Sequence, residues 1–189
     1  TDVASLAAAR ATLLAAWGGV DLVVYLAGDY VPMGADNFDL AVAERVVAVN
    51  FNGAMRLLAT VKPDLKAGGG IAFVASVAGY RGLPRAICYG PGKAALIHLA
   101  ECLHLDLSPQ DIGVWLINPG FVATPLTAKN DFAMPALLTP AQAAAAMIEG
   151  FATGRFEIHF PKRFTRVLKL IAHFPYSWSF PLIRRFTGG

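Results

Sequence analysis

The chain has 189 residues, of which 56% are hydrophobic and 15% are charged, and its formal net charge is +3. This length is enough for one hydrophobic core, and no apolar run reaches the roughly 18 residues that a membrane-spanning helix needs. Cys88 and Cys102 would lie about 21 Å apart on one helix, too far for a disulfide. We therefore expect free thiols in a cytoplasmic protein. No Cys or His cluster has metal-ligand spacing, and no metal is expected.

The expected elements alternate between helices and strands. A helix that begins near Val3 is expected to end at Gly18-Gly19. Apolar runs predict buried strands, and longer periodic stretches predict helices, in the order strand 21–26, helix 40–65, strand 70–76, helix 88–107 and strand 113–118. This alternation is typical of an α/β fold around a parallel sheet.

Small and polar residues follow the three expected strands. They are Gly28, Ser76 and the pair Pro119-Gly120. In parallel α/β sheets, ligands bind beyond the carboxyl ends of the strands. We therefore expect these residues to lie at one site, which the start of the helix at Tyr89 completes.

Tyr89 and Lys93 are four residues apart, so both side chains would lie on one face of a helix. A free tyrosine loses its proton near pH ~10, but a cation within about 4 to 6 Å lowers the pKa of a phenol toward neutrality. The pair therefore predicts a tyrosine that acts as a general acid or base.

The chain resembles the short-chain dehydrogenase/reductase family over residues 1–161. Six segments carry the resemblance, in the order and at about the spacing of the family: Asp2-Val3, Ala27-Gly28, residues 50–53 with Asn50, Ser76, Tyr89 with Lys93, and Pro119-Gly120 with Thr124. The resemblance implies a Rossmann-like, doubly wound parallel sheet in a three-layer α/β/α arrangement. It also implies reversible hydride transfer between a nicotinamide cofactor and a carbonyl or alcohol.

The resemblance assigns a role to each matching residue. Tyr89 would be the general acid/base, Lys93 would lower its pKa and hold the nicotinamide ribose, and Ser76 would position the substrate carbonyl. Asn50 would anchor a water in a proton relay. The implied cofactor-binding residues are Asp2, Val3, Ala27, Gly28, Tyr89, Lys93, Pro119, Gly120, Val122 and Thr124.

Further expectations concern the substrate and the assembly. The apolar connection at residues 124–140 is similar to the family's mobile substrate lid and favours an apolar carbonyl or alcohol substrate. The two long helices would pair in a homodimer or homotetramer. The segment that usually distinguishes NAD from NADP is absent, so the expected cofactor is NAD or NADP.

The family's Gly-rich first turn, Thr-Gly-x-x-x-Gly-x-Gly, has no match in this chain. Residue 1 would therefore correspond to a position after the family's third strand, and the fold is expected to lack its first βαβαβ half. We interpret the chain as a fragment of a larger enzyme that is inactive by itself. The strand at residues 21–26 would then expose an unpaired apolar edge. Gly90 and Gly92 also depart from the family pattern and weaken the helix locally.

Several candidates have a structural alternative. Asp2, Ser76 and Thr124 could each serve as the cap of a helix or turn. Asn52 competes with Asn50 for the role in the site.

The other tyrosines and the histidines are expected to have structural roles. Tyr25 and Tyr80 are interpreted as packing or pocket-wall residues. His98, His104 and His159 are interpreted as surface or core residues.

Residues 162–189 form a basic tail. Residues 155–189 contain seven Lys or Arg against one acid, Glu157, a net charge of +6. The expected helix presents a basic face with Lys162, Arg166, Lys169 and His173, and an apolar face with Phe164, Val167, Leu168 and Ile171. Residues 173–181 are expected to break this helix.

Two interpretations of the tail remain open. Its apolar face could cover the substrate pocket or a neighbouring subunit, or the tail could bind the inner face of a membrane. Nucleic-acid binding is not expected, because the basic residues form one short face. The alternative to an enzyme is a non-catalytic Rossmann-like binding or membrane-associated module, and a third hypothesis is an active enzyme tethered by its tail.

Overall fold

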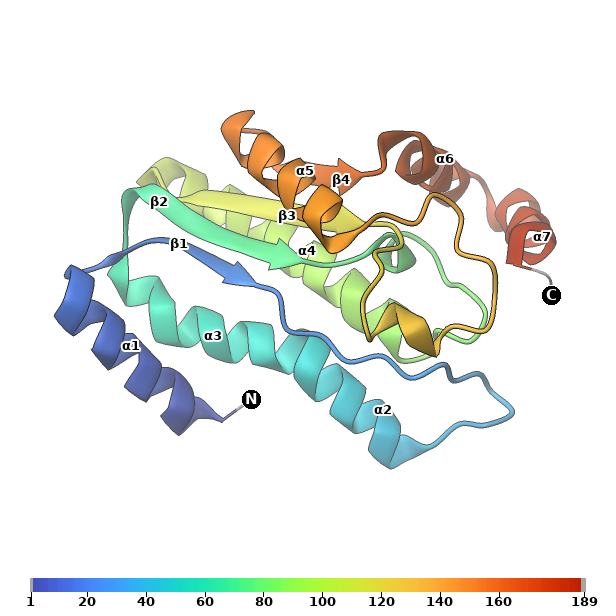
Figure 1. The fold of residues 1–189 in the computed structure, drawn as a ribbon, viewed down its shortest axis with the longest axis horizontal. Coiled ribbons are helices and arrows are strands. Elements are labelled where there is room, and N and C mark those ends of the chain that lie inside the picture. Colours follow the sequence, from blue (N-terminus) through green and yellow to red (C-terminus); the bar gives the residue numbers. More distant parts are fainter. Residues whose placement is uncertain (1, 188–189) are drawn as a thin grey trace.

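The computed structural model describes residues 2–187, which form a four-stranded parallel sheet flanked by helices (Figure 1). The strands, in their order across the sheet, are β1 (Val20–Tyr25), β2 (Leu65–Val74), β3 (Gly113–Pro119) and β4 (Glu157–Phe160). The helices are α1 (Val3–Trp17), α2 (Leu40–Val47), α3 (Gly53–Val61), α4 (Tyr89–Leu107), α5 (Pro140–Ala152), α6 (Lys162–His173) and α7 (Tyr176–Thr187). The α/β class expected from the sequence is confirmed.

The helix ends follow from local sequence chemistry. Asp2 caps α1 by accepting hydrogen bonds from the backbone N–H groups of Ala4 (3.0 Å) and Ser5 (3.2 Å). Gly18 ends α1 in the left-handed conformation, with φ 66°, which glycine adopts without a steric cost. The helix predicted between Val3 and Gly18 is therefore confirmed.

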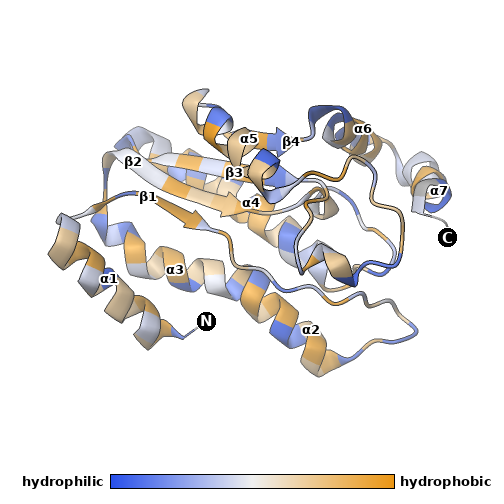
Figure 2. Cartoon of the chain, viewed as in Figure 1, coloured by the Kyte–Doolittle hydropathy of each residue, from blue (hydrophilic) through white to orange (hydrophobic). Residues whose placement is uncertain are grey.

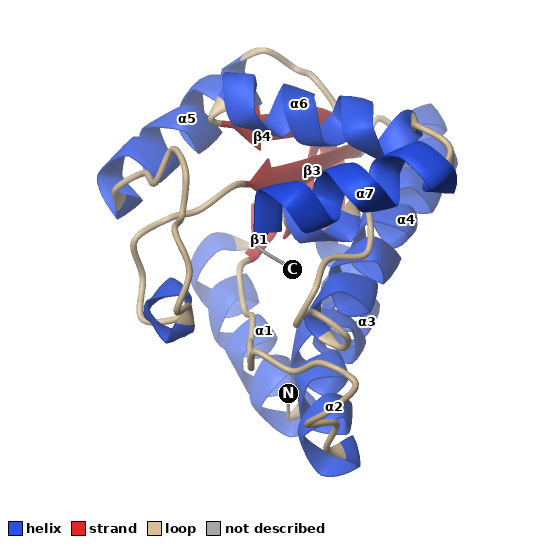
Figure 3. Cartoon of the chain, turned by 90° about the vertical axis from the view of Figure 1, so that its right-hand side faces the viewer, coloured by secondary structure: helices blue, strands red, loops and turns tan. Residues whose placement is uncertain are grey.

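The two faces of the sheet are covered by different helices (Figure 3). Because side chains alternate along a strand, Phe73 of β2 packs with Leu96 of α4, whereas Val74 and Ile117 pack with Ala143 of α5. α3 lies on the same face as α4, since its buried residues belong to the same cluster. The result is a three-layer α/β/α arrangement.

Several elements differ from the sequence prediction. The helix expected at residues 40–65 is interrupted by a π turn at Ala48–Asn52, and its end is a 3-10 turn at Lys62–Asp64. β2 begins earlier than predicted, at Leu65, and ends at Val74, so that Ser76 lies beyond the strand. The C-terminal part of the sheet also contains α5 and β4, which the sequence analysis did not resolve as elements.

The tail differs most from its prediction, and its last two residues, 188–189, lie outside the described range. The chain leaves the helix at Phe174 and Pro175, but it is helical again from Tyr176 and continues through Pro181. Proline inside a helix removes one backbone donor, which leaves the carbonyl of Ser177 without its usual partner. Ser177 is exposed, so water can satisfy that carbonyl.

The predicted faces of α6 are also partly wrong. Val167, expected on the covered apolar face, is 52% exposed. Lys169, expected on the solvated basic face, turns inward and pairs with Glu157 of β4. Ile171 is buried as expected for the apolar face, and Thr165, which was not assigned to either face, is buried as well.

β1 forms an edge of the sheet among the described residues. Its inner side chains, Val23 and Tyr25, pack into the core on the α3–α4 face. Leu22 and Val24, on the opposite face of the strand, are exposed, as is Leu26 just after it.

The first helix is apolar and poorly covered. α1 contains no buried residue, and Trp17 at its end is 72% exposed. Figure 2 shows hydrophobic residues on both α1 and β1. Within residues 2–187, none of the helices combines the length and the hydropathy that crossing a bilayer requires.

Candidate active site

Tyr89 opens α4, and Lys93 follows it one turn later on the same face, as the sequence predicts. The Lys93 Nζ atom lies 5.7 Å from the centroid of the Tyr89 ring. The same atom donates a hydrogen bond to the carbonyl oxygen of Val74 at 2.8 Å, and Lys93 is only 4% exposed. The last residue of β2 therefore fixes the cation beside the phenol.

Burial dominates the ionisation of both groups. It lowers the pKa of Lys93 to about 8, because a buried ammonium loses its hydration. It raises the pKa of Tyr89, and a hydrogen bond with Ser76 offsets only part of this effect, while the nearby Tyr30 raises it further. The expected lowering of the Tyr89 pKa by Lys93 is therefore wrong for this geometry, in which the ammonium turns toward a backbone carbonyl.

Ser76 is buried and opens the 3-10 turn Val77–Gly79. Its Oγ atom accepts a hydrogen bond from the backbone N–H of Ala78 at 3.1 Å, so the serine does cap the turn. It also lines the same cavity as Tyr89. The Ser76 side chain therefore caps the turn and also lines the cavity.

Asn50 lies in the π turn Ala48–Asn52 and is fully buried. Its Nδ2 atom donates to the carbonyl oxygens of Asp29 (2.7 Å) and Val46 (3.0 Å), and its Oδ1 atom accepts from the N–H of Asp29 at 3.3 Å. Single π turns inside α-helices are frequent at functional sites. The competing residue, Asn52, is only half-buried.

Gly28, Asn50 and Lys93 meet beyond the end of β1. A Cβ atom placed on Gly28 would lie 3.3 Å from Asn50 Oδ1 and 3.7 Å from Lys93 Nζ. Ala27 and Gly28 are themselves exposed. A side chain at position 28 would therefore lie against both Asn50 and the buried cation.

The glycines before Lys93 also have a structural reason. A Cβ atom on Gly90 would lie 3.3 Å from the carbonyl oxygen of Ala78, and one on Gly92 would lie 3.4 Å from the Cβ of Asn50. These small residues let α4 approach both the Ser76 turn and the π turn. The departures Gly90 and Gly92 therefore bring the site residues together.

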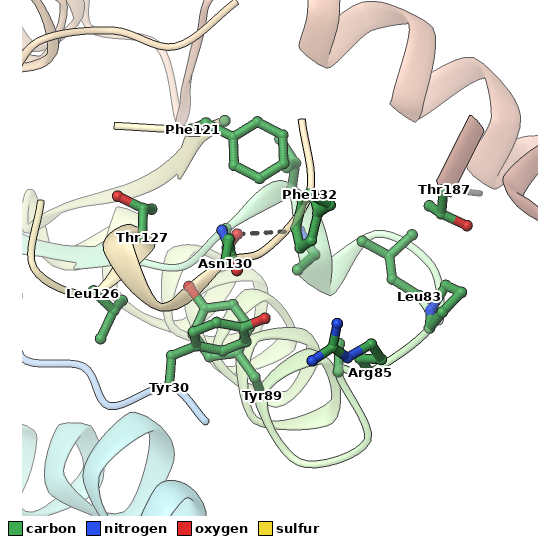
Figure 4. A pocket seen from close by; sticks show the side chains of 16 residues that line it. Tyr30, Leu83, Arg85, Tyr89, Phe121, Leu126, Thr127, Asn130, Phe132 and Thr187 are labelled. Atoms are coloured by element: carbon green, nitrogen blue, oxygen red, sulfur yellow. Dashed lines mark hydrogen bonds between the residues drawn. The ribbon is translucent and has the colours of Figure 1, made fainter. Parts of the chain in front are cut away.

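A cavity of about 220 Å³ lies in front of Ser76 and Tyr89 (Figure 4). The ring of Tyr30 packs edge-on against that of Tyr89, with centroids 5.0 Å apart. Phe121 and Phe132 form a second aromatic pair, with centroids 5.9 Å apart. Most of the wall is therefore apolar, with the serine and tyrosine hydroxyls at one end.

The segment expected to be a lid covers this cavity. Lys129 donates from Nζ to the carbonyl oxygen of Tyr30 at 2.7 Å and lies 3.6 Å from Asp29. Arg85 pairs with Asp131 at 2.6 Å. Two polar links therefore hold this segment against the opposite wall of the cavity.

The expected cofactor-side residues fall into two groups. Pro119, Gly120, Val122 and Thr124 continue from β3 into the lid, where Thr124 caps the turn that follows by its bonds with Thr127. Of this first group, only Gly120 lines the cavity. The second group, Asp2 and Val3, lies at the exposed start of α1 and does not line it. For Asp2 the capping alternative is the one observed.

The wall residues are the part of the site that sequence reasoning missed. Tyr30, Phe121, Phe132 and Thr187 all line the cavity, and they come from three separate segments. Tyr30 had a usable signal, because it follows the Ala27-Gly28 step at the end of a predicted strand, and Phe132 had one because it lies within the expected lid.

The remaining candidates have structural roles, as expected. The Tyr25 hydroxyl donates to the carbonyl oxygen of Val49. His98, which is largely exposed, pairs with Glu101 at 3.3 Å, and His159 shares a hydrogen bond with Thr165 at 2.6 Å. Among residues 2–187, no group of three His, Cys, Asp or Glu could hold a metal ion.

This arrangement matches a known family. Residues 1–134 fit the family model of the short chain dehydrogenases, and the chain belongs to this family. It is 35% identical over 159 residues to a protein of Myxococcus xanthus named an uncharacterized oxidoreductase, a match that covers 82% of this chain and 63% of that protein. The chain thus spans less than two thirds of this relative.

Solved structures share the fold. A short chain dehydrogenase from Burkholderia cenocepacia, in complex with NADP, aligns with a TM-score of 0.80 at 21% identity, over 91% of this chain and 70% of that one. A short chain dehydrogenase/reductase from Burkholderia phymatum, in complex with NAD, aligns with a TM-score of 0.79 at 22% identity, over 89% and 71% of the two chains. At these identities the likeness concerns the fold.

Proposed function

We propose that the protein is an NAD(P)-dependent oxidoreductase that interconverts a carbonyl and an alcohol, with Tyr89 as general acid/base. The observation that carries this proposal is the convergence of Ser76 and Tyr89 on one apolar cavity, with Lys93 buried behind them. Membership of the short chain dehydrogenase family supports the reaction class. The activity belongs to the whole protein, and we expect residues 1–189 alone to be inactive.

The residues at the strand ends fit a nicotinamide cofactor, NAD or NADP. The space in front of Gly28 would be filled by any side chain, and it adjoins the buried Lys93 ammonium, which suits a ribose hydroxyl. The other side of the cofactor would contact Pro119, Gly120, Val122 and Thr124, and its adenine end would lie near Asp2 and Val3. When bound, the cofactor supplies or accepts the hydride at the carbonyl carbon.

The chain's own residues handle the proton. In the reductive direction, Tyr89 donates its proton to the carbonyl oxygen, which Ser76 polarises by a hydrogen bond. A high pKa keeps Tyr89 protonated, and therefore able to donate, at neutral pH. Lys93, whose pKa is about 8, can exchange protons near neutral pH and would restore the phenol through water held near Asn50.

The cavity indicates the substrate class. About 220 Å³ enclosed by Phe121, Phe132, Leu126 and the Tyr30 ring suits a compact apolar ketone, aldehyde or secondary alcohol. The aromatic walls would bind the hydrocarbon part, and the hydroxyls at one end would fix the oxygen.

The test is to compare NADH and NADPH oxidation by the full-length protein on a panel of apolar ketones and aldehydes with that of Tyr89→Phe. We expect turnover to fall at least about 100-fold in the variant, the size of a general-acid contribution, while cofactor binding is kept. Unchanged turnover in Tyr89→Phe would refute the role of this tyrosine. Absence of cofactor binding by the full-length protein would favour the alternative, a non-catalytic Rossmann-like binding module.

Further proposals concern partners and location. We propose a homodimer or homotetramer formed through the helices α3 and α4, whose exposed apolar residues include Met55 and Leu105. The free thiols of Cys88 and Cys102 fit a cytoplasmic location.

We also propose that the tail lies on the inner face of the membrane. Every charged residue after Glu157 is basic, and α7 exposes Tyr176 (63%), Trp178 (64%) and Phe180 (46%). Aromatic rings together with Lys and Arg favour an anionic lipid surface. Because Thr187 lines the cavity, such contact would bring its mouth close to apolar molecules in the bilayer.

A further inference from the structure

A second polar cluster lies behind the cavity, around the carboxylate of Glu157 at the start of β4. The Oε1 atom of Glu157 accepts hydrogen bonds from the Tyr80 hydroxyl (2.8 Å) and from Nδ2 of Asn118 (2.8 Å). Its Oε2 atom accepts from Nζ of Lys169 on α6. One carboxylate of β4 therefore binds side chains from three other parts of the fold.

Two of these partners lead directly to the active site. Tyr80 ends the 3-10 turn that Ser76 begins, and the backbone N–H of Gly79 donates to the Ser76 carbonyl at 3.0 Å within that turn. Asn118 is the residue immediately before Pro119-Gly120 on β3. The Glu157 carboxylate is thus connected to the carbonyl side of the site through Tyr80 and to the cofactor side through Asn118.

The pKa shifts in this cluster favour an ionised Glu157 and a protonated Tyr80. Burial disfavours the ionised form of Glu157, but the hydrogen bonds from Lys169, Asn118 and Tyr80 outweigh it together and lower the pKa of the carboxyl group. Burial and the adjacent carboxylate raise the pKa of Tyr80, so that its hydroxyl remains a donor. The Oε1 atom has two lone pairs, so it can accept from the phenol and from the amide N–H together, and ionisation of Glu157 strengthens both bonds.

Asn118 depends on this carboxylate for its orientation. The residue is fully buried, and its Oδ1 atom has no hydrogen-bond partner within the described part of the chain. Its bond to Glu157 therefore fixes the amide. Losing the acceptor would leave the donors of both Tyr80 and Asn118 unsatisfied, which is costly.

We propose that Glu157 is a positioning residue that sets the Ser76 turn and the Pro119-Gly120 loop at a fixed separation, so that carbonyl and cofactor meet in reacting geometry. This inference rests on the proposed oxidoreductase function. The two hydrogen bonds of Glu157 Oε1 lead to separate predictions, because Tyr80 connects it to the carbonyl side of the site and Asn118 connects it to the cofactor side.

The experiment measures kcat, the KM of the carbonyl substrate and the Kd of the cofactor in the full-length protein. Tyr80→Phe should lower kcat/KM for the carbonyl about tenfold, the equivalent of one hydrogen bond to a charged group, and leave the cofactor Kd unchanged. Asn118→Leu, which is similar in volume, should raise the cofactor Kd about tenfold.

Glu157 itself is tested by a pair of variants. Glu157→Ala should produce both effects together. Glu157→Gln keeps an acceptor oxygen for Tyr80 and Asn118 and should recover most of the loss. A role limited to stability would lower the folded fraction and would produce neither this split nor this rescue.

Tyr176→Phe is the matched control, because it removes a hydroxyl outside the cluster, and it should behave as the wild type does. Urea unfolding of each variant identifies any that fail to fold. Equal kinetics of wild type, Tyr80→Phe and Glu157→Ala would overturn the inference, as would a uniform fall of all parameters in every variant. If the wild type turned over no substrate, the proposed function would fail, and an unchanged cofactor Kd in Asn118→Leu and Glu157→Ala would overturn the inference independently.

Discussion

At the residue scale, Lys93 is a charged side chain in a buried position. Its ammonium group is almost fully buried, and its single described hydrogen bond is to the carbonyl of Val74. Burial lowers its pKa from 10.5 to about 8. Such a cation is costly to the free protein, which is consistent with a group kept for binding and proton exchange.

The shift predicts how stability depends on pH. Between about pH 8 and 10.5 the unfolded chain carries a protonated Lys93 and the folded chain a neutral one, so the unfolded state binds more protons and stability rises with pH. The free energy of unfolding of the wild type, minus that of Lys93→Met, should rise by roughly 3 kcal/mol across this interval. It should be constant at lower pH, where both states are protonated. Urea unfolding at a series of pH values measures the difference, and a flat profile would contradict the buried position of Lys93.

Residue spacing was sufficient to predict where the proposed reacting groups lie on their elements. Tyr89 and Lys93 lie one helical turn apart, and Ser76 follows a strand, as predicted. The wall residues could not be predicted in this way. Tyr30 and Phe121 line one cavity because of the tertiary path of two loops, and an aromatic residue in a loop has no spacing rule that identifies its partner.

At the scale of elements, the close approach of the Ser76 turn to α4 determines the geometry of the site. A Cβ atom on Gly79 would lie 2.7 Å from the Ile97 side chain and 2.8 Å from the backbone of Lys93. Real Cβ atoms do not come so close to backbone, so a larger residue must push the turn away from the helix.

We therefore expect Gly79→Ala to lower the free energy of unfolding by about 2 kcal/mol, the cost of overpacking, and to reduce turnover by displacing Ser76. Gly82→Ala is the matched control in the same loop, since its Cβ would meet nothing within 4 Å. Urea unfolding measures both variants. Equal stability of Gly79→Ala and Gly82→Ala would show that the turn is not held against α4.

The alternation of elements was predictable because strands and helices have distinct periodicities. The π turn at Ala48–Asn52 was not, because it depends on the Asn50 amide bonding to Asp29, a contact across the fold. The tail was mispredicted for a similar reason. The inward turn of Lys169 depends on Glu157, which lies on a strand that the sequence analysis did not resolve.

At the scale of the whole molecule, the tail and the active site are parts of one structure. α6 packs Phe164 against Phe121 of the cavity wall, with ring centroids 5.7 Å apart. Arg81 donates to the carbonyl oxygens of Ala172 (2.6 Å) and Phe174 (2.7 Å), which ties the end of α6 to the loop after Ser76. α7 lies across the carboxyl ends of the strands (Figure 3).

The proposed membrane contact predicts that the full-length protein floats with vesicles that contain anionic lipid and stays in the soluble fraction with zwitterionic vesicles. The triple variant Trp178→Gln, Arg184→Gln, Arg185→Gln should lose flotation, because it removes both apolar and electrostatic attraction. Lys62→Gln with Lys66→Gln, which removes two exposed lysines elsewhere, is the control. Flotation of the triple variant equal to that of the wild type would rule out the tail as the contact.

The central claim is that hydride transfer in this protein is coupled to proton donation by Tyr89. The most direct measurement is a single turnover of the full-length protein with cofactor deuterated at the transferring position, for wild type and Tyr89→Phe. We predict one deuterium on the former carbonyl carbon of each product, and a rate at least about 100-fold lower in the variant with cofactor affinity unchanged. A product without deuterium, or a variant as fast as the wild type, would contradict the account.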